Sequence, residues 1–458
     1  MKKQPEQFDA IVIGTGQAGP SLAVDLAKAG RKVAILERHL FGGTCVNTGC
    51  IPTKTMIANA RVAHMARRAA DYGVSTGEIS VDMKRVKQRK DEVSTLSKTG
   101  VEKMLRSTEN CTVVTAHARF VSDHELEANG RRLTAKQIFI NVGGRAAIPD
   151  MKGLNQVSYL TNSTMMELDV VPEHLVIVGG SYIGLEFGQM CRRFGSKVTI
   201  LQREPRLIPK EDPDVSEGIK KILEKEGITI LLNANCIEVE KKGDTIEVRA
   251  GSNTVEGSHL LIAAGRRPNT DSLGLENTSI KMDKHGYIQV DDYLRTTADG
   301  VWAMGDCNGR GAFTHTSYND YEIVAANVLH DEPRKVTDRI TAYALYIDPP
   351  LGRCGMTETE VRATGRKAMM GMRPMTRIGR AVEKGETEGF IKILVDAESK
   401  LILGASILGV EGDEAIHCIL DMMYAKAPYK TFERAVQIHP TVSELLPTII
   451  GELKPLEA

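Results

Sequence analysis

The chain opens with short apolar runs separated by glycines. An apolar run at 8–13 (FDAIVI) predicts a buried strand, helical spacing follows at 22–29, and a second strand at 32–36 ends in Glu37. The turn after the first strand contains Gly14, Gly16 and Gly19. Glycines here let a pyrophosphate approach a helix N-terminus, and an acid about twenty residues later can bind ribose hydroxyls. The pattern predicts a dinucleotide-binding unit.

The same pattern returns further along the chain. A run at 175–178 leads into a turn, a helix ending at Phe194 and a strand at 197–201. The turn contains Gly179, Ser181, Tyr182 and Ile183, with Ser181 where a glycine is usual. Gln202 carries no charge to hold a 2′-hydroxyl, and Arg203 offers a cation to a 2′-phosphate, which predicts NADPH, with NADH possible. The alternative for Arg203 is an ordinary surface arginine.

Two such units imply two bound dinucleotides: FAD in the first and a nicotinamide nucleotide in the second, stacked for hydride transfer.

The charge balance, 59 basic against 59 acidic residues, lacks the basic field of a nucleic-acid binder. The densest basic run, 84–90, is expected to be a solvated helix face. No apolar run approaches the ~18 residues needed to span a membrane. Eight cysteines in 458 residues do not form a secreted disulfide framework, so we expect a cytoplasmic protein without membrane or nucleic-acid partners.

A cysteine pair lies between the two units. Cys45 and Cys50 are separated by Val46, Asn47, Thr48 and Gly49. Residues with this spacing point about 140° apart on a regular helix, so the two thiols can bond only across a distorted turn, which Gly49 makes feasible. So small a loop would stabilise a fold by only about 2 kcal/mol, which argues against a structural role. Cys50 also precedes an expected helix from Pro52 onward, whose N-terminus favours a thiolate. A metal site and buried core cysteines remain the alternatives.

Residues 42–54 (GGTCVNTGCIPTK) strongly resemble the active-site segment of the class I pyridine nucleotide-disulfide oxidoreductases. Three further motifs appear in the family's order: AAGR at 263–266, AMGD at 303–306 and HPTVSE at 439–444. The family includes glutathione reductase, dihydrolipoamide dehydrogenase and mercuric reductase. The resemblance therefore covers essentially the whole chain.

The resemblance implies a role for individual residues. NADPH would reduce FAD beneath Tyr182, which acts as a lid over the nicotinamide pocket. Lys54 would lie beside the flavin, paired with Glu186. Cys50 would become the flavin-facing thiolate and Cys45 the thiol that attacks the acceptor. Further cofactor contacts are expected at Gly43, Thr44, Ala118, Gly144, Gly265, Asp306 for the ribityl chain, and Thr314 for the flavin edge.

The resemblance also implies an acid–base pair, His439 oriented by Glu444, contributed by the other subunit of a homodimer. Without the resemblance, a surface histidine and a carboxylate in the first turn of a helix are the simpler interpretation. The implied architecture is α/β, with two Rossmann-like dinucleotide-binding domains and a C-terminal α/β dimerisation domain. We expect the FAD domain at 1–148 and 267–336, the NAD(P) domain at 149–266 and the dimerisation domain at 337–458, including a hairpin at 391–408 and a helix at 414–424.

The acceptor is the least determined feature. The sequence as a whole most resembles mercuric-reductase-like proteins. This resemblance predicts that the acceptor is a disulfide, a metal or metalloid ion, or an oxidant, and that the enzyme holds no resident metal. His439, absent from mercuric reductases, and the end GELKPLEA, without their paired cysteines, argue against mercury itself. Val24 stands where glutathione reductases place an arginine. Dihydrolipoamide dehydrogenase is the first alternative, and a flavin-bound redox sensor without turnover is the second. A flavin monooxygenase or oxidase would have no use for the cysteine pair.

The other cysteines are expected to be buried free thiols: Cys111, Cys191, Cys236, Cys307, Cys354 and Cys418.

Overall fold

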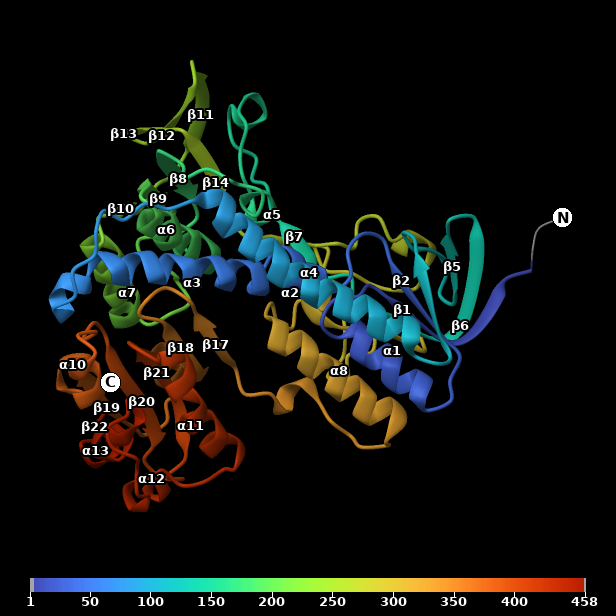
Figure 1. Ribbon diagram of the computed structural model, residues 1–458. Coiled ribbons are helices and arrows are strands. Elements are labelled where there is room, and N and C mark those ends of the chain that lie inside the picture. The colour runs from blue at the N-terminus through green and yellow to red at the C-terminus, as the bar shows by residue number, and fades with distance from the viewer. Residues whose placement is uncertain (1–3, 457–458) are drawn as a thin grey trace.

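The computed structural model describes residues 4–456, which form three blocks, each around its own sheet (Figure 1). The first sheet carries the N-terminal glycine turn. Its parallel strands are, in spatial order, β3 (Cys111–Thr115), β2 (Val33–Glu37), β1 (Glu6–Ile13), β6 (Arg131–Ile140) and β16 (Val301–Ala303). Two antiparallel strands, β5 (Glu125–Ala128) and β4 (Arg119–Ser122), continue from the other half of β6.

Alternation along β1 divides its side chains between two cores. Ala10 and Val12 pack with α1 (Gly19–Lys28) and α8 (Thr314–Leu329), whereas Ile11 and Ile13 pack on the opposite face. The strand begins two residues before the predicted run because Glu6 and Gln7, although polar, pair with β6. The glycine turn therefore leaves the carboxyl end of a strand whose two faces are both covered.

The second block repeats this plan. Its parallel strands are, in spatial order, β10 (Thr229–Leu231), β9 (Lys197–Leu201), β8 (His174–Val178) and β14 (His259–Ile262). The helices of this block are α6 (Tyr182–Phe194) and α7 (Pro213–Lys225). An antiparallel sheet projects from it, formed by β11 (Ile237–Lys242), β12 (Thr245–Ala250) and β13 (Asn253–Gly257). α6 ends at Phe194, as the sequence predicts.

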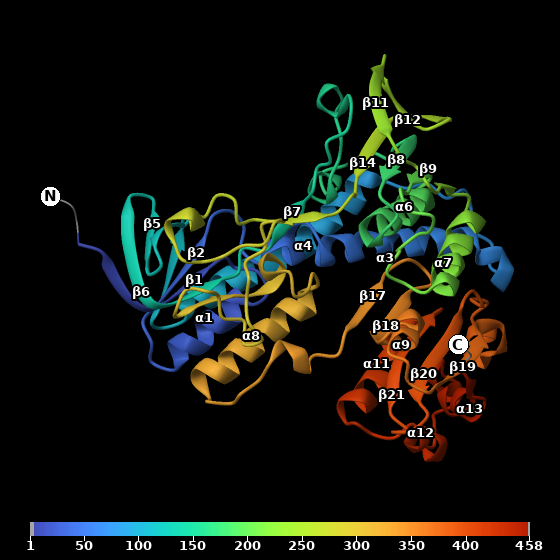
Figure 2. The same ribbon diagram turned by 180° about the vertical axis from the view of Figure 1, so that it is seen from behind.

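The third block is an antiparallel sheet with helices. Its strands are, in spatial order, β17 (Ala342–Leu345), β18 (Leu351–Gly355), β21 (Ile402–Leu408), β20 (Phe390–Asp396), β19 (Ala368–Pro374) and β22 (Lys454–Pro455). The helices are α9 (Glu358–Ala363), α10 (Gly379–Glu383), α11 (Gly412–Tyr424), α12 (Lys430–Arg434) and α13 (Leu446–Gly451). The predicted hairpin is β20–β21 and the predicted helix is α11. Both views place this block beside α7, away from the β11–β13 sheet (Figure 1, Figure 2).

Two long helices and a ribbon connect the first two blocks. α3 (Cys50–Arg67) and α4 (Met83–Ser107) pack together, and α3 also contacts α6. β7 (Gly144–Ala146) pairs with β15 (Arg266–Pro268) where the chain leaves and re-enters the first block. Short helices α2 (Gly43–Asn47) and α5 (Asn162–Met165) complete this region. The domain limits stay predictions.

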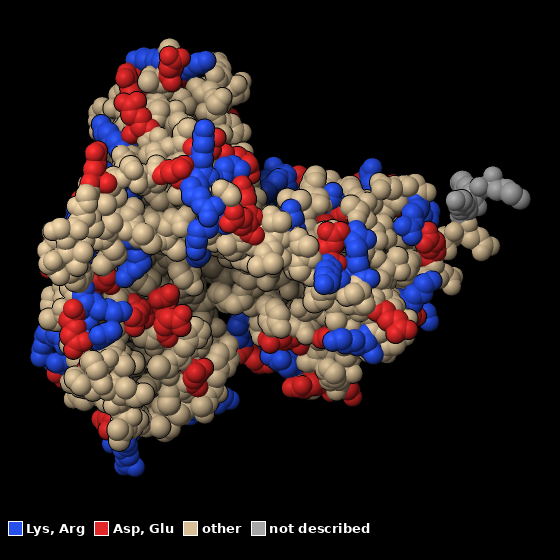
Figure 3. All heavy atoms as spheres, viewed as in Figure 1, with Lys and Arg blue, Asp and Glu red and all other residues tan. Residues whose placement is uncertain are grey.

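The charged surface is mixed in sign. On the face shown in Figure 3, basic and acidic side chains are interspersed. The basic run 84–90 lies on α4, where Lys84, Arg85, Gln88 and Arg89 are exposed as predicted, whereas Lys90 is buried and donates to Asp91. None of the helices within 4–456 is long and apolar enough to cross a membrane.

Candidate active site

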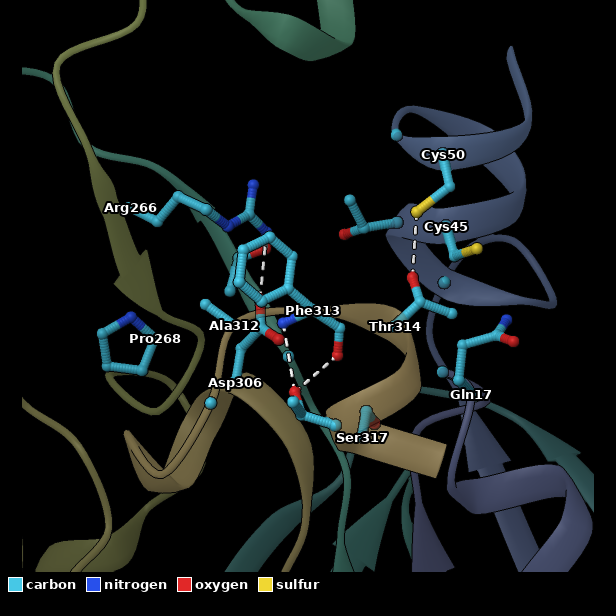
Figure 4. Close-up of a pocket in the computed structure, with 18 of the residues that line it drawn as sticks. Gln17, Cys45, Cys50, Arg266, Pro268, Asp306, Ala312, Phe313, Thr314 and Ser317 are labelled. Carbon is cyan, nitrogen blue, oxygen red and sulfur yellow. Dashed lines mark hydrogen bonds and ion pairs between the residues drawn. The ribbon is translucent and has the colours of Figure 1, made fainter. Parts of the chain in front are cut away.

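A cavity of about 1970 Å³ lies where the three blocks meet. Its wall includes both nucleotide turns, the cysteine segment and β17. Pockets for one small ligand reach roughly 1,000 Å³, so this cavity has room for two dinucleotides. Figure 4 shows its centre, where Cys45 of α2 and Cys50 at the start of α3 face the start of α8.

The glycine turn after β1 is packed too tightly for side chains. A Cβ at Gly14 would lie 2.3 Å from Asn141 O, and one at Gly16 would lie 2.8 Å from Asn141 Oδ1. Buried Asn141 accepts a hydrogen bond from Gly19 N at 3.0 Å and donates one to Met304 O at 3.0 Å. The turn therefore exposes bare backbone to the cavity at the N-terminus of α1, as a pyrophosphate requires. These residues fit FAD.

We expect Gly14→Ala to lose most of its FAD and to unfold at a lower temperature. Gly14 has φ +99°, and the added methyl collides with Asn141 O, so the free energy of unfolding falls by about 2–4 kcal/mol. Gly30→Ala is the matched control, because Gly30 has φ +83° but nothing within 4 Å of its Cβ position. Flavin content and Tm measure both variants. Equal losses would show that the Asn141 contact is unimportant.

Glu37, at the end of β2, supports this turn. Its Oε2 accepts from Thr15 N at 3.0 Å and from the Thr15 hydroxyl at 2.6 Å, while Oε1 accepts from His39 N at 2.9 Å. A carboxylate has about four lone-pair sites, so capacity for a ribose hydroxyl remains. Glu37 thus has a structural role, and its binding of the ribose stays a prediction.

Gln202 occupies the equivalent place in the second unit. Its Oε1 accepts from Gly180 N at 2.9 Å, so a neutral amide supports the turn without adding charge. Gly179 has φ +121°, and a Cβ there would lie 2.3 Å from Ala263 O. The predicted nicotinamide-nucleotide residues that line the cavity are Ser181, Tyr182, Ile183 and Arg203. Arg203 is 78% exposed and bonds to Glu204 at 3.0 Å.

The helical path is interrupted between Cys45 and Cys50, as the spacing of the two cysteines requires if they are to bond. α2 ends at Asn47, two residues intervene, and α3 begins at Cys50. Gly49 fits this break because a Cβ there would lie 2.9 Å from Thr44 O. Both thiols are free, and Cys50 Sγ lies 2.9 Å from Thr314 Oγ1 at the start of α8 (Figure 4). The pair is therefore presented at a helix N-terminus, inside the cavity.

The two thiols differ in pKa. The hydrogen bond with Cys45, assisted by Thr314 and the charge of Lys54, lowers the pKa of Cys50 to about 6. The same hydrogen bond, followed by burial, raises the pKa of Cys45. At neutral pH the reduced pair consequently holds its negative charge on Cys50.

A charge pair joins the first and second blocks beside this thiolate. Lys54 Nζ donates to Glu186 Oε2 at 2.6 Å, and Glu186 Oε1 accepts from Tyr346 N at 3.0 Å. Lys54 Nζ also lies 4.7 Å from the Tyr346 ring centroid. The structure thus brings together the predicted partners, with the ammonium held between a carboxylate and an aromatic face.

Three aromatic rings meet in the cavity wall at the start of α6. Phe313 and Tyr343 stack with ring centroids 5.3 Å apart. Tyr182 meets both edge-on, at 5.6 Å from Phe313 and 5.7 Å from Tyr343. The sequence motifs predicted a role for Tyr182, but they did not indicate Phe313 or Tyr343, the two rings that it contacts.

His439 and Glu444 lie outside the cavity wall. His439 Nδ1 and Glu444 Oε2 are 2.8 Å apart, and the His439 side chain is 78% exposed. The nearby apolar residues Val436 and Ile438 are 99% and 80% exposed. The structure brings the two members together but does not bring them to the cysteines of the same chain.

The other predicted cofactor contacts divide into two groups. Gly19 and Gly265 shape turns behind the cavity wall: a Cβ at Gly19 would lie 2.2 Å from Gly14 O, and Gly265 has φ +124°. The residues that line it are Gly14, Gly16, Glu37, Gly43, Thr44, Ala118, Gly144, Asp306 and Thr314. Burial raises the pKa of Asp306, although Arg266 Nη2 lies 3.5 Å from its Oδ2.

The remaining cysteines only partly follow the prediction. Cys191, Cys307 and Cys354 are buried, and Cys111 is half-buried. Cys236 and Cys418 are exposed, so the prediction was wrong for both: Cys236 lies in the loop before β11, and Cys418 on the outer side of α11. Within 4–456, no three His, Cys, Asp or Glu side chains are grouped to hold a metal ion.

Comparison with known proteins decides the family. The family model described as pyridine nucleotide-disulphide oxidoreductase matches residues 8–320, and that of the family's dimerisation domain matches residues 341–450. The chain belongs to the pyridine nucleotide-disulphide oxidoreductases. The predicted family, α/β architecture, enzyme class and use of FAD and NAD(P)H are thereby confirmed. The dimerisation domain indicates a homodimer, as in this family.

Individual relatives of this oxidoreductase extend over its length. It is 36% identical over 456 residues to the probable pyridine nucleotide-disulfide oxidoreductase RclA of Escherichia coli (strain K12), covering 98% of this chain and 100% of that one. It is 30% identical to the mercuric reductase of Bacillus cereus, covering 94% and 70%. A solved Cu(II) complex of the HOCl-induced flavoprotein disulfide reductase RclA from Escherichia coli matches with TM-score 0.89 at 36% identity, covering 97% and 99%. The roles of individual site residues stay predictions.

Proposed function

We propose that this enzyme takes two electrons from NADPH and passes them through FAD to a Cys45–Cys50 disulfide, which then reduces an external acceptor. One observation carries the proposal: the cysteine pair opens, 2.9 Å from Thr314, into the cavity that both dinucleotide turns also line. A structural disulfide needs no such cavity.

The chain's own residues divide the work. Bound FAD supplies hydride acceptance from the nicotinamide and delivery of two electrons to the disulfide. The turn at 14–19 and Asp306 hold that flavin, and Ser181, Ile183 and Arg203 hold NADPH. Reduction breaks the S–S bond and leaves Cys50 as a thiolate, stabilised by Thr314 and by the charge of Lys54. Cys45 takes up the proton that is delivered with the two electrons as hydride, and it becomes the outward nucleophile once a base removes that proton.

His439 of the second subunit is our candidate for that base. An imidazole ring can accept and donate a proton, and Glu444 Oε2, 2.8 Å from Nδ1, fixes its orientation. The exposed Val436 and Ile438 next to it favour burial of this segment against another copy of the chain. The homodimer then completes each site with a histidine in trans.

For the acceptor we propose a disulfide or a thiophilic metal ion or oxidant. The RclA structure with Cu(II) and the mercuric reductases are similar to this chain, which makes Cu(II) the metal ion to test first. Dihydrolipoyl dehydrogenases are also similar, so lipoamide belongs in the same test. We further propose the domain limits given above and a cytoplasmic location, where thiols stay reduced.

The decisive experiment is anaerobic NADPH titration of the purified holoenzyme. Uptake of about four electrons per flavin, two for the flavin and two for the disulfide, supports the proposal. Uptake of about two excludes a redox role for the cysteine pair. Steady-state turnover with lipoamide, glutathione disulfide, Cu(II), Hg(II) and hypochlorite-treated thiols then selects the acceptor class. Reduction by NADPH with no acceptor turned over would favour a redox sensor.

Nucleotide choice is tested at Arg203. We expect Arg203→Gln to raise the KM for NADPH by about 10- to 100-fold, the loss expected for a charge-assisted phosphate contact, while the KM for NADH hardly changes. Arg206→Gln is the control, because half-buried Arg206 follows the same strand end but does not line the cavity, and it donates to Pro209 O at 3.0 Å. Equal changes in both KM values for Arg203→Gln would make it an ordinary surface arginine.

A further inference from the structure

A line of polar side chains crosses the sheet of the third block. Tyr343, Arg353, Ser406 and Lys392 stand directly opposite one another on β17, β18, β21 and β20. Opposite residues on antiparallel strands project to the same face. Arg353 is 1% and Lys392 0% exposed, so this line is a buried interface rather than a surface.

The line faces the acidic segment 211–214, where a loop of the second block enters α7. Lys392 Nζ lies 3.1 Å from Asp212 Oδ2 and 2.8 Å from Asp214 Oδ1, and Arg353 Nη1 lies 4.0 Å from Asp212 Oδ2. Breaking a buried charge pair is costly, so these contacts fix the loop before α7 against the third block. Glu211, one residue earlier in the loop, is fixed with it.

Glu211 depends on Tyr343. Its Oε1 accepts the Tyr343 hydroxyl, and its Oε2 has no hydrogen-bond partner among the described residues. The carboxyl is 1% exposed, and burial raises its pKa. A buried polar group with one partner loses much if that partner is removed, so the hydrogen bond holds the Tyr343 ring in one place.

That ring supports Tyr182. Tyr343 and Phe313 stack with an interplanar angle of 13°, and Tyr182 stands against them at 83° and 85°. Edge-to-face contacts of this kind are favourable beyond the area that they bury. Tyr182 lies at the start of α6, whereas both supports come from segments more than a hundred residues later in the chain.

We propose that Tyr343 is a positioning residue that holds the Tyr182 lid closed, and that Glu211 anchors it from behind. This rests on the proposed function in one respect, the role of Tyr182 as the lid. A nicotinamide ring must displace Tyr182 from these contacts to reach the flavin. The stability of the closed lid therefore lowers the apparent nucleotide affinity.

The test measures binding of NADP⁺ to the oxidised holoenzyme by calorimetry. We expect Tyr343→Phe to lower the Kd by about threefold and Tyr343→Leu by up to about tenfold, the range for loosening and then losing an edge-to-face contact. Glu211→Gln keeps an acceptor oxygen and should stay near wild type. In turnover, Tyr343→Phe lowers the KM for NADPH and leaves kcat nearly unchanged.

Two controls separate lid anchoring from general damage. 2′-Phospho-ADP-ribose lacks the nicotinamide, so its Kd should stay constant across the series. Tyr321→Phe also removes a hydroxyl that donates to a carboxylate, at 2.6 Å from Asp25 Oδ2, and should leave NADP⁺ binding unchanged. Weaker NADP⁺ binding in Tyr343→Phe, or equal shifts for both ligands, would overturn the proposal. If Tyr182→Ala leaves the Kd for NADP⁺ unchanged, Tyr182 is not a lid over the nicotinamide pocket, and the proposed function is wrong in that respect. If Tyr182→Ala changes it and Tyr343→Leu does not, only the anchoring inference fails.

Discussion

Cys50→Ser holoenzyme reduced with NADPH shows no long-wavelength absorbance and turns over no acceptor. The absorbance requires a thiolate against the flavin, and Cys50 is the thiol whose pKa is lowered to about 6. Serine stays protonated, so both the absorbance and the disulfide are lost. We expect acceptor turnover to fall by at least about 1,000-fold, as when an enzyme loses its covalent nucleophile. Reduction of the flavin by NADPH should continue, because Lys54, Glu186 and Tyr182 are unchanged.

The measurement is anaerobic spectrophotometry, with electrons taken up per flavin counted in the same titration. Cys418→Ser is the matched control, because Cys418 is exposed on α11 and should leave both quantities as in the wild type. In the reduced wild-type enzyme the absorbance should disappear as the pH falls through about 6, since protonation of Cys50 removes the thiolate. If the absorbance persists in Cys50→Ser, Cys50 is not the thiol that faces the flavin.

Local chemistry explains what the sequence made predictable. The turn at 14–19 and the break at Gly49 depend on residues within a few positions of one another, so their types and spacing determine the geometry. Cys50 at a helix N-terminus is likewise readable from the chain, since the helical pattern begins at once. These features account for the two nucleotide units and for the choice of Cys50 as thiolate.

Other parts of the site depend on contacts between distant segments. Asn141 braces the turn at 14–19 from the end of β6, and Tyr343 supports Tyr182 from another block. Neither lies in a short motif with a mechanism of its own. Asn141 had one weak signal, its place directly after an apolar strand. Tyr343 had none, because its partner Glu211 is fixed by charges that pair only in the folded chain.

His439 and Glu444 illustrate another part of the site that one chain alone does not reveal. Its geometry is local, a 2.8 Å contact over a short segment, yet its proposed place of action is on another molecule. Within one chain, an exposed histidine next to exposed Val436 and Ile438 looks like ordinary surface. The match of residues 341–450 to the family's dimerisation domain is the observation that favours a partner for that segment. The assignment therefore needs a test that reports on two subunits at once.

Mixing two inactive variants should restore activity if the site is shared. Cys45→Ser and His439→Ala homodimers each lack one member at both sites, so each should retain at most a few per cent of wild-type turnover, roughly as when one member of a catalytic unit is lost. After subunit exchange, a heterodimer has one site with both substitutions and one site with none. Random pairing makes about half of the dimers mixed, so about a quarter of wild-type activity should return.

The measurement is acceptor turnover after reversible dissociation of the mixture, with each homodimer treated alone as the control. If His439 served Cys45 of its own chain, every site in the heterodimer would carry one substitution and the mixture would stay inactive. Cys45→Ser mixed with Cys50→Ser is a further control, for recovery that does not depend on His439. Both substitutions then lie on the cysteine side of the site, so no dimer contains an intact site and no activity should return. Recovery in the first mixture alone thus requires that His439 acts across the subunit boundary.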